Sequence, residues 1–350
     1  MSGTGAWKWA AVLLAVAPAG CRTPPGPSAG PGQTVDESPA IPVDVAGVPE
    51  PAGAEPKADE PTWVPAVPVT EPAPAHGQAV PRGDLADPMQ RGHQAFAQED
   101  FDAAAQAFQQ AVDLDPALPE AHHWLGVSLR KLGRLDESLA ESLEALRLRP
   151  DYAEAHGNVG NVYYRKGDHG TALERLLESV RLNPDYAEGH LTLGVVLYAE
   201  GRFDQAVARY RRAIELDPDS VLAHNNLGIA LDAQGDYDDA IAAFGEALNL
   251  DPDYAVAHAG LGKSLWEAGW QEQAVLEFLE AARLRPDFAV ARVNLIQTFY
   301  ELGRYAEAWE NVHAARLHGV EVPEALVQAL SQEMPDPSPP PPPDDAAEGG

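Results

Sequence analysis

The chain repeats itself every 34 residues, and this period limits its fold more than any other feature does. Prolines recur at this spacing without insertion or deletion, at Pro116, Pro150, Pro184, Pro218, Pro252 and Pro286. Two series of glycines keep the same step, one from Gly92 to Gly262 and one from Gly133 to Gly303. A fixed period of this size is typical of solenoids, in which each unit buries its apolar face only against its neighbours. We therefore predict one elongated repeat domain.

The proline series and the two glycine series have different structural roles. Proline cannot continue a helix, so each proline separates one unit from the next. The Gly133 series falls between two helical patterns, where a left-handed helix end favours a residue without a β-carbon. The Gly92 series lies inside a helix at a cost of about 1 kcal/mol relative to Ala, which indicates that another helix packs closely there. Each unit is therefore predicted to be two antiparallel helices.

The unit at 153–186 places apolar residues at helical spacing, including Val159, Val162, Leu173 and Leu176, in phase with the glycine and proline marks. In this pattern the chain resembles the tetratricopeptide repeat family. The resemblance implies an all-α, right-handed superhelix (solenoid) of about seven helical hairpins, at 85–118, 119–152, 153–186, 187–220, 221–254, 255–288 and 289–322. Apolar residues in 323–334 predict a capping helix after the last hairpin.

The N-terminus is typical of an export signal. Lys8 precedes an apolar segment from Trp9 to Ala17 that is too short to span a membrane. Ala19-Gly20-Cys21 resembles the end of a bacterial lipobox, and Cys21 is the chain's single cysteine. We expect a signal peptide at 1–20, lipidation at Cys21 and an envelope location facing the periplasm or the outside. Ordinary cleavage, giving a soluble periplasmic or secreted protein, stays open.

The segments on either side of the repeats differ from them in composition. Residues 21–84 are rich in Pro, Ala, Gly and acids, which predicts a disordered tether, and 335–350 form a Pro and acid tail. The formal charge is -30, and the repeats at 85–322 carry -19 of it. A surface this acidic opposes phosphate, so nucleic acid is not expected as a partner. Membrane contact is expected only through Cys21.

Family geometry turns six positions of each first helix toward a concave inner wall. Aromatic, amide and cationic residues at these positions are the residue types that recognise an extended peptide. They are Trp124, Arg130, Lys131, Asn158, Asn161, Tyr164, Arg165, Tyr198, Asn225, Asn226, Lys263, Trp266, Asn294 and Tyr300. We predict this set as the partner-binding groove.

Catalysis and cofactors find little support in the sequence. There is no Gly-rich phosphate loop, and Ser and Asp residues fall at helix ends, where caps explain them. Histidines recur at His122, His156, His190, His224 and His258. First helices pack about 8–10 Å apart, too far for such a row to surround one Zn²⁺, so packing between helices is expected instead of metal binding.

We therefore expect a non-catalytic scaffold that binds a partner protein or peptide, with help in assembling a cell-envelope complex as one role. Two alternatives stay open. Asn158, Asn226 and Asn294 share one repeat position, as in the asparagine ladder of the O-linked N-acetylglucosamine transferase family, which suggests the substrate-recognition arm of a glycosyltransferase-like system. The other alternative is a soluble exported protein that self-associates.

Overall fold

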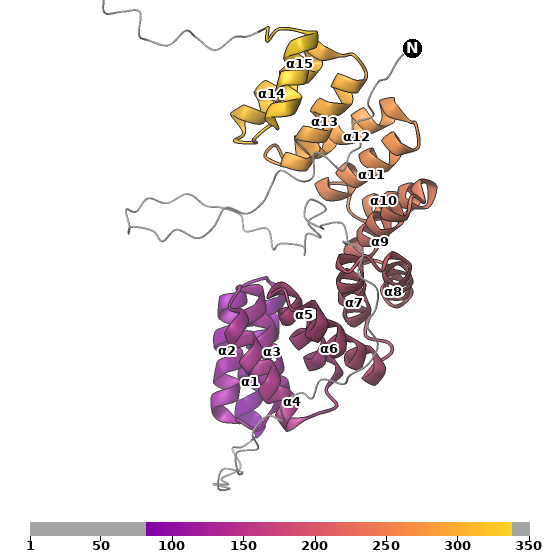
Figure 1. The fold of residues 1–350 in the computed structure, drawn as a ribbon. Coiled ribbons are helices and arrows are strands. Elements are labelled where there is room, and N and C mark those ends of the chain that lie inside the picture. The colour runs from indigo at the N-terminus through magenta and orange to yellow at the C-terminus, as the bar shows by residue number, and fades with distance from the viewer. Residues whose placement is uncertain (1–81, 338–350) are drawn as a thin grey trace, which may run out of the picture. The chain divides into compact units, whose positions relative to one another are not determined.

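The computed structural model describes residues 82–337, and this part of the chain consists of helices joined by turns (Figure 1). It contains 15 α-helices and no strand, so the predicted all-α class is confirmed. The described residues fall into two compact units, divided between Gly201 and Arg202. We call residues 82–201 the N-terminal unit and 202–337 the C-terminal unit, and describe each by itself.

The N-terminal unit holds seven helices, and each packs on the next along the chain. Their bounds are α1 Arg82–Ala97, α2 Phe101–Leu114, α3 Pro119–Lys131, α4 Leu135–Leu148, α5 Ala153–Arg165, α6 His169–Leu182 and α7 Ala187–Ala199. The odd-numbered helices, which open each repeat, are called first helices, and the others second helices. First helices also touch one another, α3 on α5 and α5 on α7. They therefore form a continuous row.

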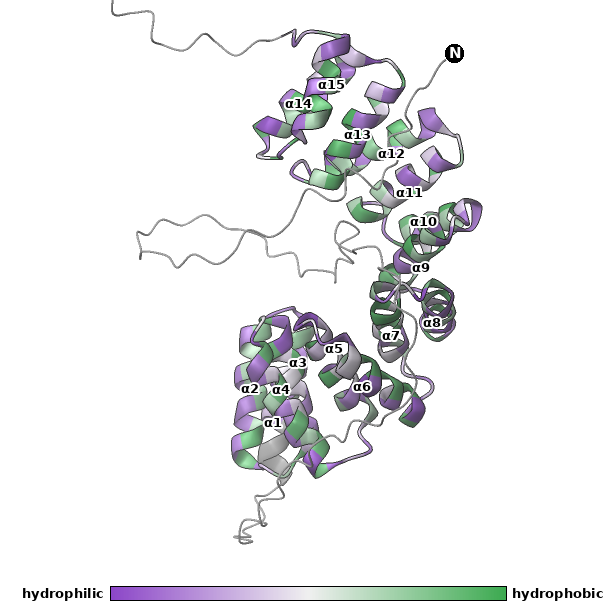
Figure 2. Cartoon of the chain, in the orientation of Figure 1, coloured by the Kyte–Doolittle hydropathy of each residue, from purple (hydrophilic) through white to green (hydrophobic). Residues whose placement is uncertain are grey.

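The C-terminal unit follows the same plan. Its helices are α8 Phe203–Leu216, α9 Val221–Gln234, α10 Tyr237–Leu250, α11 Ala255–Glu267, α12 Gln271–Leu284, α13 Ala289–Glu301, α14 Tyr305–Leu317 and α15 Glu324–Glu333. Here α9, α11 and α13 are first helices, and again each contacts the next first helix. Hydrophobic and hydrophilic residues alternate along the helices of both units, as amphipathic packing requires (Figure 2).

Glycines inside the first helices are sites of close helix contact. A β-carbon on Gly160 would lie 2.6 Å from Cγ of Leu176, and one on Gly126 would lie 2.5 Å from Oγ of Ser142. Gly92, Gly228 and Gly262 meet phenylalanine rings of their paired second helices in the same way. The close approach predicted from the repeated mid-helix glycine is confirmed at these five positions.

The turns between paired helices take the left-handed conformation expected of the Gly133 series. All six of these glycines have positive φ, from 71° at Gly201 and Gly303 to 88° at Gly269. In the first hairpin the equivalent residue is Glu99, with φ 59°. A non-glycine residue in this conformation is uncommon, so the first repeat departs from the others in its turn as well as in its sequence.

The histidine series joins each repeat to the one before it. Nε2 of each histidine lies 3.0 Å from the carbonyl oxygen of the proline six residues earlier, in the pairs His122–Pro116, His156–Pro150, His190–Pro184, His224–Pro218 and His258–Pro252. In the last repeat Arg292 takes the histidine's place, and its Nε donates to the Pro286 carbonyl at 3.0 Å. We call these contacts the proline clasps. They bond the carbonyl of the proline in the turn that follows each second helix.

The C-terminal end of the described chain is covered by α15, which packs on α14. Leu330 of α15 and Trp309 of α14 are fully buried, and the Trp309 indole donates to the Met334 carbonyl at 2.9 Å. No helix within 82–337 combines the length and apolar character that crossing a membrane requires. The predicted signal peptide, Cys21, most of the tether and most of the tail lie outside the described residues.

Candidate partner-binding surface

The predicted groove residues all lie on first helices, and each unit holds its own set. In the N-terminal unit α3, α5 and α7 bring together Trp124, Arg130, Lys131, Asn158, Asn161, Tyr164, Arg165 and Tyr198. In the C-terminal unit α9, α11 and α13 carry Asn225, Asn226, Lys263, Trp266, Asn294 and Tyr300. Because adjacent first helices touch, the residues of each set lie near one another. Six of them are buried: Arg130, Asn158, Asn161, Tyr198, Asn225 and Asn226.

Arg130 links three consecutive first helices in the N-terminal unit. Its Nε donates to Oδ1 of Asn158 on α5 at 2.5 Å, and its Nη2 lies 3.2 Å from Oε1 of Glu188 on α7. Arg130 is 6% exposed, whereas the Glu188 side chain is 54% exposed. Glu188 also accepts a hydrogen bond from the Tyr186 hydroxyl at 3.1 Å. An ion pair between residues two repeats apart shows that the inner faces of α3, α5 and α7 converge.

The two asparagines of α5 lie one turn apart and differ completely in their bonding. The Asn158 amide donates to Oγ of Ser142 at 2.7 Å and to Oγ of Ser138 at 3.3 Å, while its oxygen accepts from Arg130. Asn161 is 2% exposed, and neither its amide nitrogen nor its amide oxygen has a hydrogen-bond partner among the described residues. An unsatisfied buried polar group costs about 1–3 kcal/mol, so the Asn161 amide destabilises the partner-free fold.

Two exposed cations stand beside this amide, at the C-terminal ends of α3 and α5. Nη1 of Arg165 donates to the Arg130 carbonyl at 2.9 Å, which places it next to Lys131. Partial burial, together with the charge of Arg130, lowers the pKa of Lys131 and of Arg165. Within residues 82–337 neither cation pairs with a carboxylate; Lys131 lies 5.6 Å from the Phe101 ring centroid. Tyr164 is half-buried beside them.

Trp124 forms part of an aromatic cluster as well as the predicted wall. Its ring centroid lies 4.7 Å from that of His93 and 5.4 Å from that of Phe96, with the rings edge to face. His123 packs 5.5 Å from Trp124, and its burial lowers its pKa to about 4. His123 is therefore neutral at physiological pH. This end of the N-terminal unit is held by ring packing, and only part of Trp124 faces outward.

In the C-terminal unit the predicted residues are mostly engaged with the protein itself. Lys263 pairs with Asp232, which also accepts from Oγ of Ser264 at 2.8 Å. The Asn225 amide donates to Oδ1 of Asn226 at 3.2 Å, and both residues are buried. Trp266 and Tyr300 pack against the core, and Asn294 is half-buried. The Asn225 amide oxygen is buried without a hydrogen-bond partner among the described residues.

Sequence reasoning selected cations, amides and aromatics for the wall and missed the acids among them. Glu188 and Asp232, which pair with Arg130 and Lys263, also occupy inner-wall positions of their repeats. Glu267 and Glu301 do so as well; burial, with the charges of Asp232 and Glu301, raises the pKa of Glu267. The repeat alignment itself could have identified these acids, because all four fall in phase with the predicted set.

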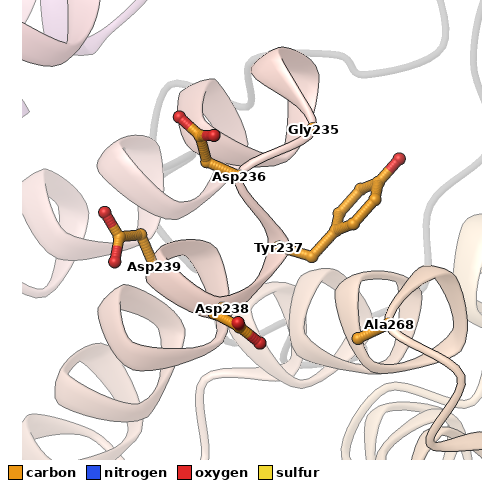
Figure 3. Close-up of a pocket in the computed structure, with 6 residues that line it drawn as sticks. All are labelled: Gly235, Asp236, Tyr237, Asp238, Asp239 and Ala268. Atoms are coloured by element: carbon orange, nitrogen blue, oxygen red, sulfur yellow. The ribbon is translucent and has the colours of Figure 1, made fainter.

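An open cavity of about 540 Å³ lies elsewhere in the C-terminal unit, and Figure 3 shows its lining: Gly235, Asp236, Tyr237, Asp238, Asp239 and Ala268. Its three carboxylates point in different directions at the start of α10 (Figure 3), where a helix dipole favours acids. Between residues 82 and 337 no group of His, Cys, Asp or Glu could hold a metal ion. The cavity therefore has no arrangement suited to a cation.

Comparison with known proteins identifies the repeats. Residues 191–255 and 259–316 match a family model described as tetratricopeptide repeat, and 92–129, 126–167 and 160–201 match a model described as TPR repeat. Together the matches span residues 92–316 except 256–258. No curated protein matches the chain.

Two solved structures show the same fold over large parts of the chain, and a third is more similar in sequence. PilF of Pseudomonas aeruginosa is 18% identical with a TM-score of 0.53, covering 60% of this chain and 96% of its own. A tetratricopeptide repeat protein from Parabacteroides merdae is 18% identical with a TM-score of 0.50, covering 72% and 99%. TTC0263, from Thermus thermophilus, is 28% identical with a TM-score of 0.46, covering 52% and 99%.

Proposed function

Since the chain belongs to the tetratricopeptide repeat family, we propose that it is a non-catalytic scaffold that binds an extended peptide or protein segment on the first helices of its N-terminal unit. The observation that carries the proposal is Asn161, whose buried amide has neither donor nor acceptor satisfied. A peptide backbone offers one carbonyl and one N–H per residue, which is what this amide lacks. Tyr164 and Arg165 beside it belong to residue types that dominate binding energy at interfaces.

Partner binding requires the inner wall to open, because the Asn161 amide is enclosed in the partner-free protein. The Arg130–Glu188 pair is suited to such opening, since Glu188 is more than half exposed and lies on a different helix from Arg130. Arg130 is buried, so moving Glu188 away leaves its charge unpaired unless a partner group takes the place of the Glu188 carboxylate.

The proposal is tested with a random-peptide library displayed on phage and selected on the full chain. Peptides that enrich are synthesised, and their affinities are measured for wild type and for Asn161→Leu. We expect Asn161→Leu to weaken binding about tenfold, the effect of losing one or two hydrogen bonds. Folding is expected to be unharmed, because leucine removes an unsatisfied buried amide of similar volume.

The matched control is Asn249→Leu, the same chemical change at an exposed position of the second helix α10. It is expected to bind the selected peptides as wild type does. Wild-type affinity of Asn161→Leu for every selected peptide would show that partners bind elsewhere.

We further propose that the protein is exported and anchored to a cell-envelope membrane through Cys21, where it helps to assemble an envelope complex. Lys8, the short apolar segment after it and the small residues before a single cysteine support this location. The test is membrane fractionation of wild type and Cys21→Ala in a bacterial host. Wild type is expected with membranes and the variant in the soluble fraction. Recovery of both in the soluble fraction would contradict the anchor.

A further inference from the structure

We propose that the N-terminal unit selects acidic segments, with a partner carboxylate bound between Lys131 and Arg165. This inference rests on the proposed peptide-binding function and adds the charge of the partner. The two cations lie on adjacent first helices. Arg165 donates at 2.9 Å to the carbonyl of Arg130, the residue that precedes Lys131.

Several cations in residues 82–337 form no ion pair, and Lys131 and Arg165 are the two of these that lie on adjacent first helices. Asp and Glu outnumber Lys and Arg 54 to 24, so carboxylates are available around most cations. Nearby, Arg130 pairs with Glu188 and Lys166 pairs with Asp136. Lys131 and Arg165 pair with no carboxylate in the described part of the chain, although each is next to one of those paired cations in the sequence.

Helix-end electrostatics accounts for only part of this arrangement. Cations in the last turn of a helix are stabilised by its dipole, which explains one positive charge at the end of α3 and one at the end of α5. It does not explain why the two charges lie at neighbouring helix ends, where burial and the charges of Arg130 and Arg165 lower the pKa of Lys131 against the opposing charges of Glu188 and Glu99. A carboxylate placed between them would remove that repulsion.

The geometry also matches an extended peptide. Asn161 lies one helical turn before Arg165, so the unsatisfied amide and the guanidinium are on the same side of α5. If Asn161 binds the backbone of a peptide segment, the neighbouring side chains of that segment would lie near Arg165 and Lys131. Arginine binds carboxylates through paired hydrogen bonds, and the Lys131 ammonium adds a second charge.

The C-terminal unit has the opposite charge at the same repeat positions. Where α3 and α5 carry Arg130, Lys131 and Arg165, the helices α9, α11 and α13 carry Asp232, Glu267 and Glu301. Like charges placed opposite each other disfavour binding, so this unit would reject the segment that the N-terminal unit accepts. The acidic partner is therefore directed to one unit.

The experiment uses the peptides selected on the full chain. Each is synthesised together with a twin in which every Asp and Glu is replaced by Asn and Gln. We expect the selected peptides to be enriched in acids and the twins to bind about tenfold or more weakly. Lys131→Glu combined with Arg165→Glu is expected to weaken the acidic peptides by at least as much.

The matched control is Arg147→Glu combined with Arg181→Glu, which changes the net charge equally in the same unit but on second helices. These arginines are exposed and pair within their own helices, with Glu144 and Glu178. Wild-type affinity is expected for this variant. Lys131→Gln combined with Arg165→Gln provides a milder test, and circular dichroism reports whether each variant keeps its helix content.

Three outcomes separate the two proposals. Weakened binding by the twins and by the groove variants, but not by the control, supports acid selection. Twins that bind as well as the acidic peptides, or equal losses in both charge-reversed variants, would overturn acid selection and leave peptide binding standing. If no peptide enriches on the wild-type chain, the proposed function itself is wrong.

Discussion

The pKa values of histidines at one repeat position shift in opposite directions, because the neighbouring second helix supplies different residues. In each proline clasp made by a histidine, Nε2 must donate, because a carbonyl can only accept. Nδ1 of His122 lies 2.6 Å from Glu141, so it donates too, and this hydrogen bond raises the pKa of His122. One repeat later Arg175 occupies the position of Glu141, and burial, with the Arg175 charge, lowers the pKa of His156.

These directions give opposite pH dependences. A raised pKa stabilises the fold below the unfolded value of 6.5, and the contribution of His122 is lost as pH rises through its folded pKa. The lowered pKa of His156 stabilises the fold above 6.5, and this is lost as pH falls through its folded pKa. Below the unfolded value, the two clasps therefore offset each other.

The prediction is that Arg175→Glu raises the pKa of His156 above 6.5, because the new carboxylate reproduces the environment of His122. NMR titration of the imidazole resonances measures it. Glu141→Gln is the reciprocal control and is expected to lower the pKa of His122. A His156 titration that does not move would show that burial alone sets its pKa.

The bonding of individual wall residues could be predicted from the sequence only in part. The repeat position placed Arg130 and Asn158 on the wall, but it did not predict that Arg130 reaches Glu188, 58 residues away. Such a pair depends on how far each repeat rotates relative to the last, and a sequence period fixes the number of residues per repeat rather than that rotation. For the same reason Asn158 and Asn161, three residues apart on α5, could not be distinguished in advance.

At the scale of helices, two glycines inside helices have opposite effects on the stability of the fold. Gly160 of α5 faces Leu176, and the Ala172 carbonyl lies 3.1 Å from where a β-carbon would be. Gly245 of α10 has nothing within 4 Å of that point. The first glycine is required by packing, whereas the second only weakens its helix.

We predict that Gly160→Ala destabilises the α5–α6 hairpin by about 1–3 kcal/mol through overpacking. Gly245→Ala is expected to stabilise the α9–α10 hairpin by about 0.5–1 kcal/mol, the difference between the helix propensities of the two residues. Hydrogen exchange of the amides in each hairpin measures both effects separately. Equal changes of either sign at the two sites would contradict the packing argument.

At the scale of the whole molecule, the repeat period was enough to predict the fold class, because proline, glycine and small residues recur in phase with the apolar positions. The helix pairs, the left-handed glycines and the close glycine contacts follow from that pattern. The departures occur at the first and last repeats. There Glu99 replaces a turn glycine, and Arg292 replaces a clasp histidine while keeping the same carbonyl contact.

The division of charge between the units is also a property of the whole chain. Both units follow one structural plan, yet corresponding inner-wall positions carry Lys131 and Arg165 in one unit and Glu267 and Glu301 in the other. Side chains at these positions are not needed to pack the helices in the way that the glycines are. They are therefore free to differ between repeats without changing the fold.

The proline clasps affect how the number of repeats can change during evolution. Every clasp joins a donor to a proline six residues before it, so all of its chemistry lies within one short stretch of sequence. A recombination event that inserts or deletes 34 residues leaves every junction with its own proline and its own donor. The gene can therefore gain or lose whole repeats in one step, and the junctions of the resulting protein need no compensating mutations.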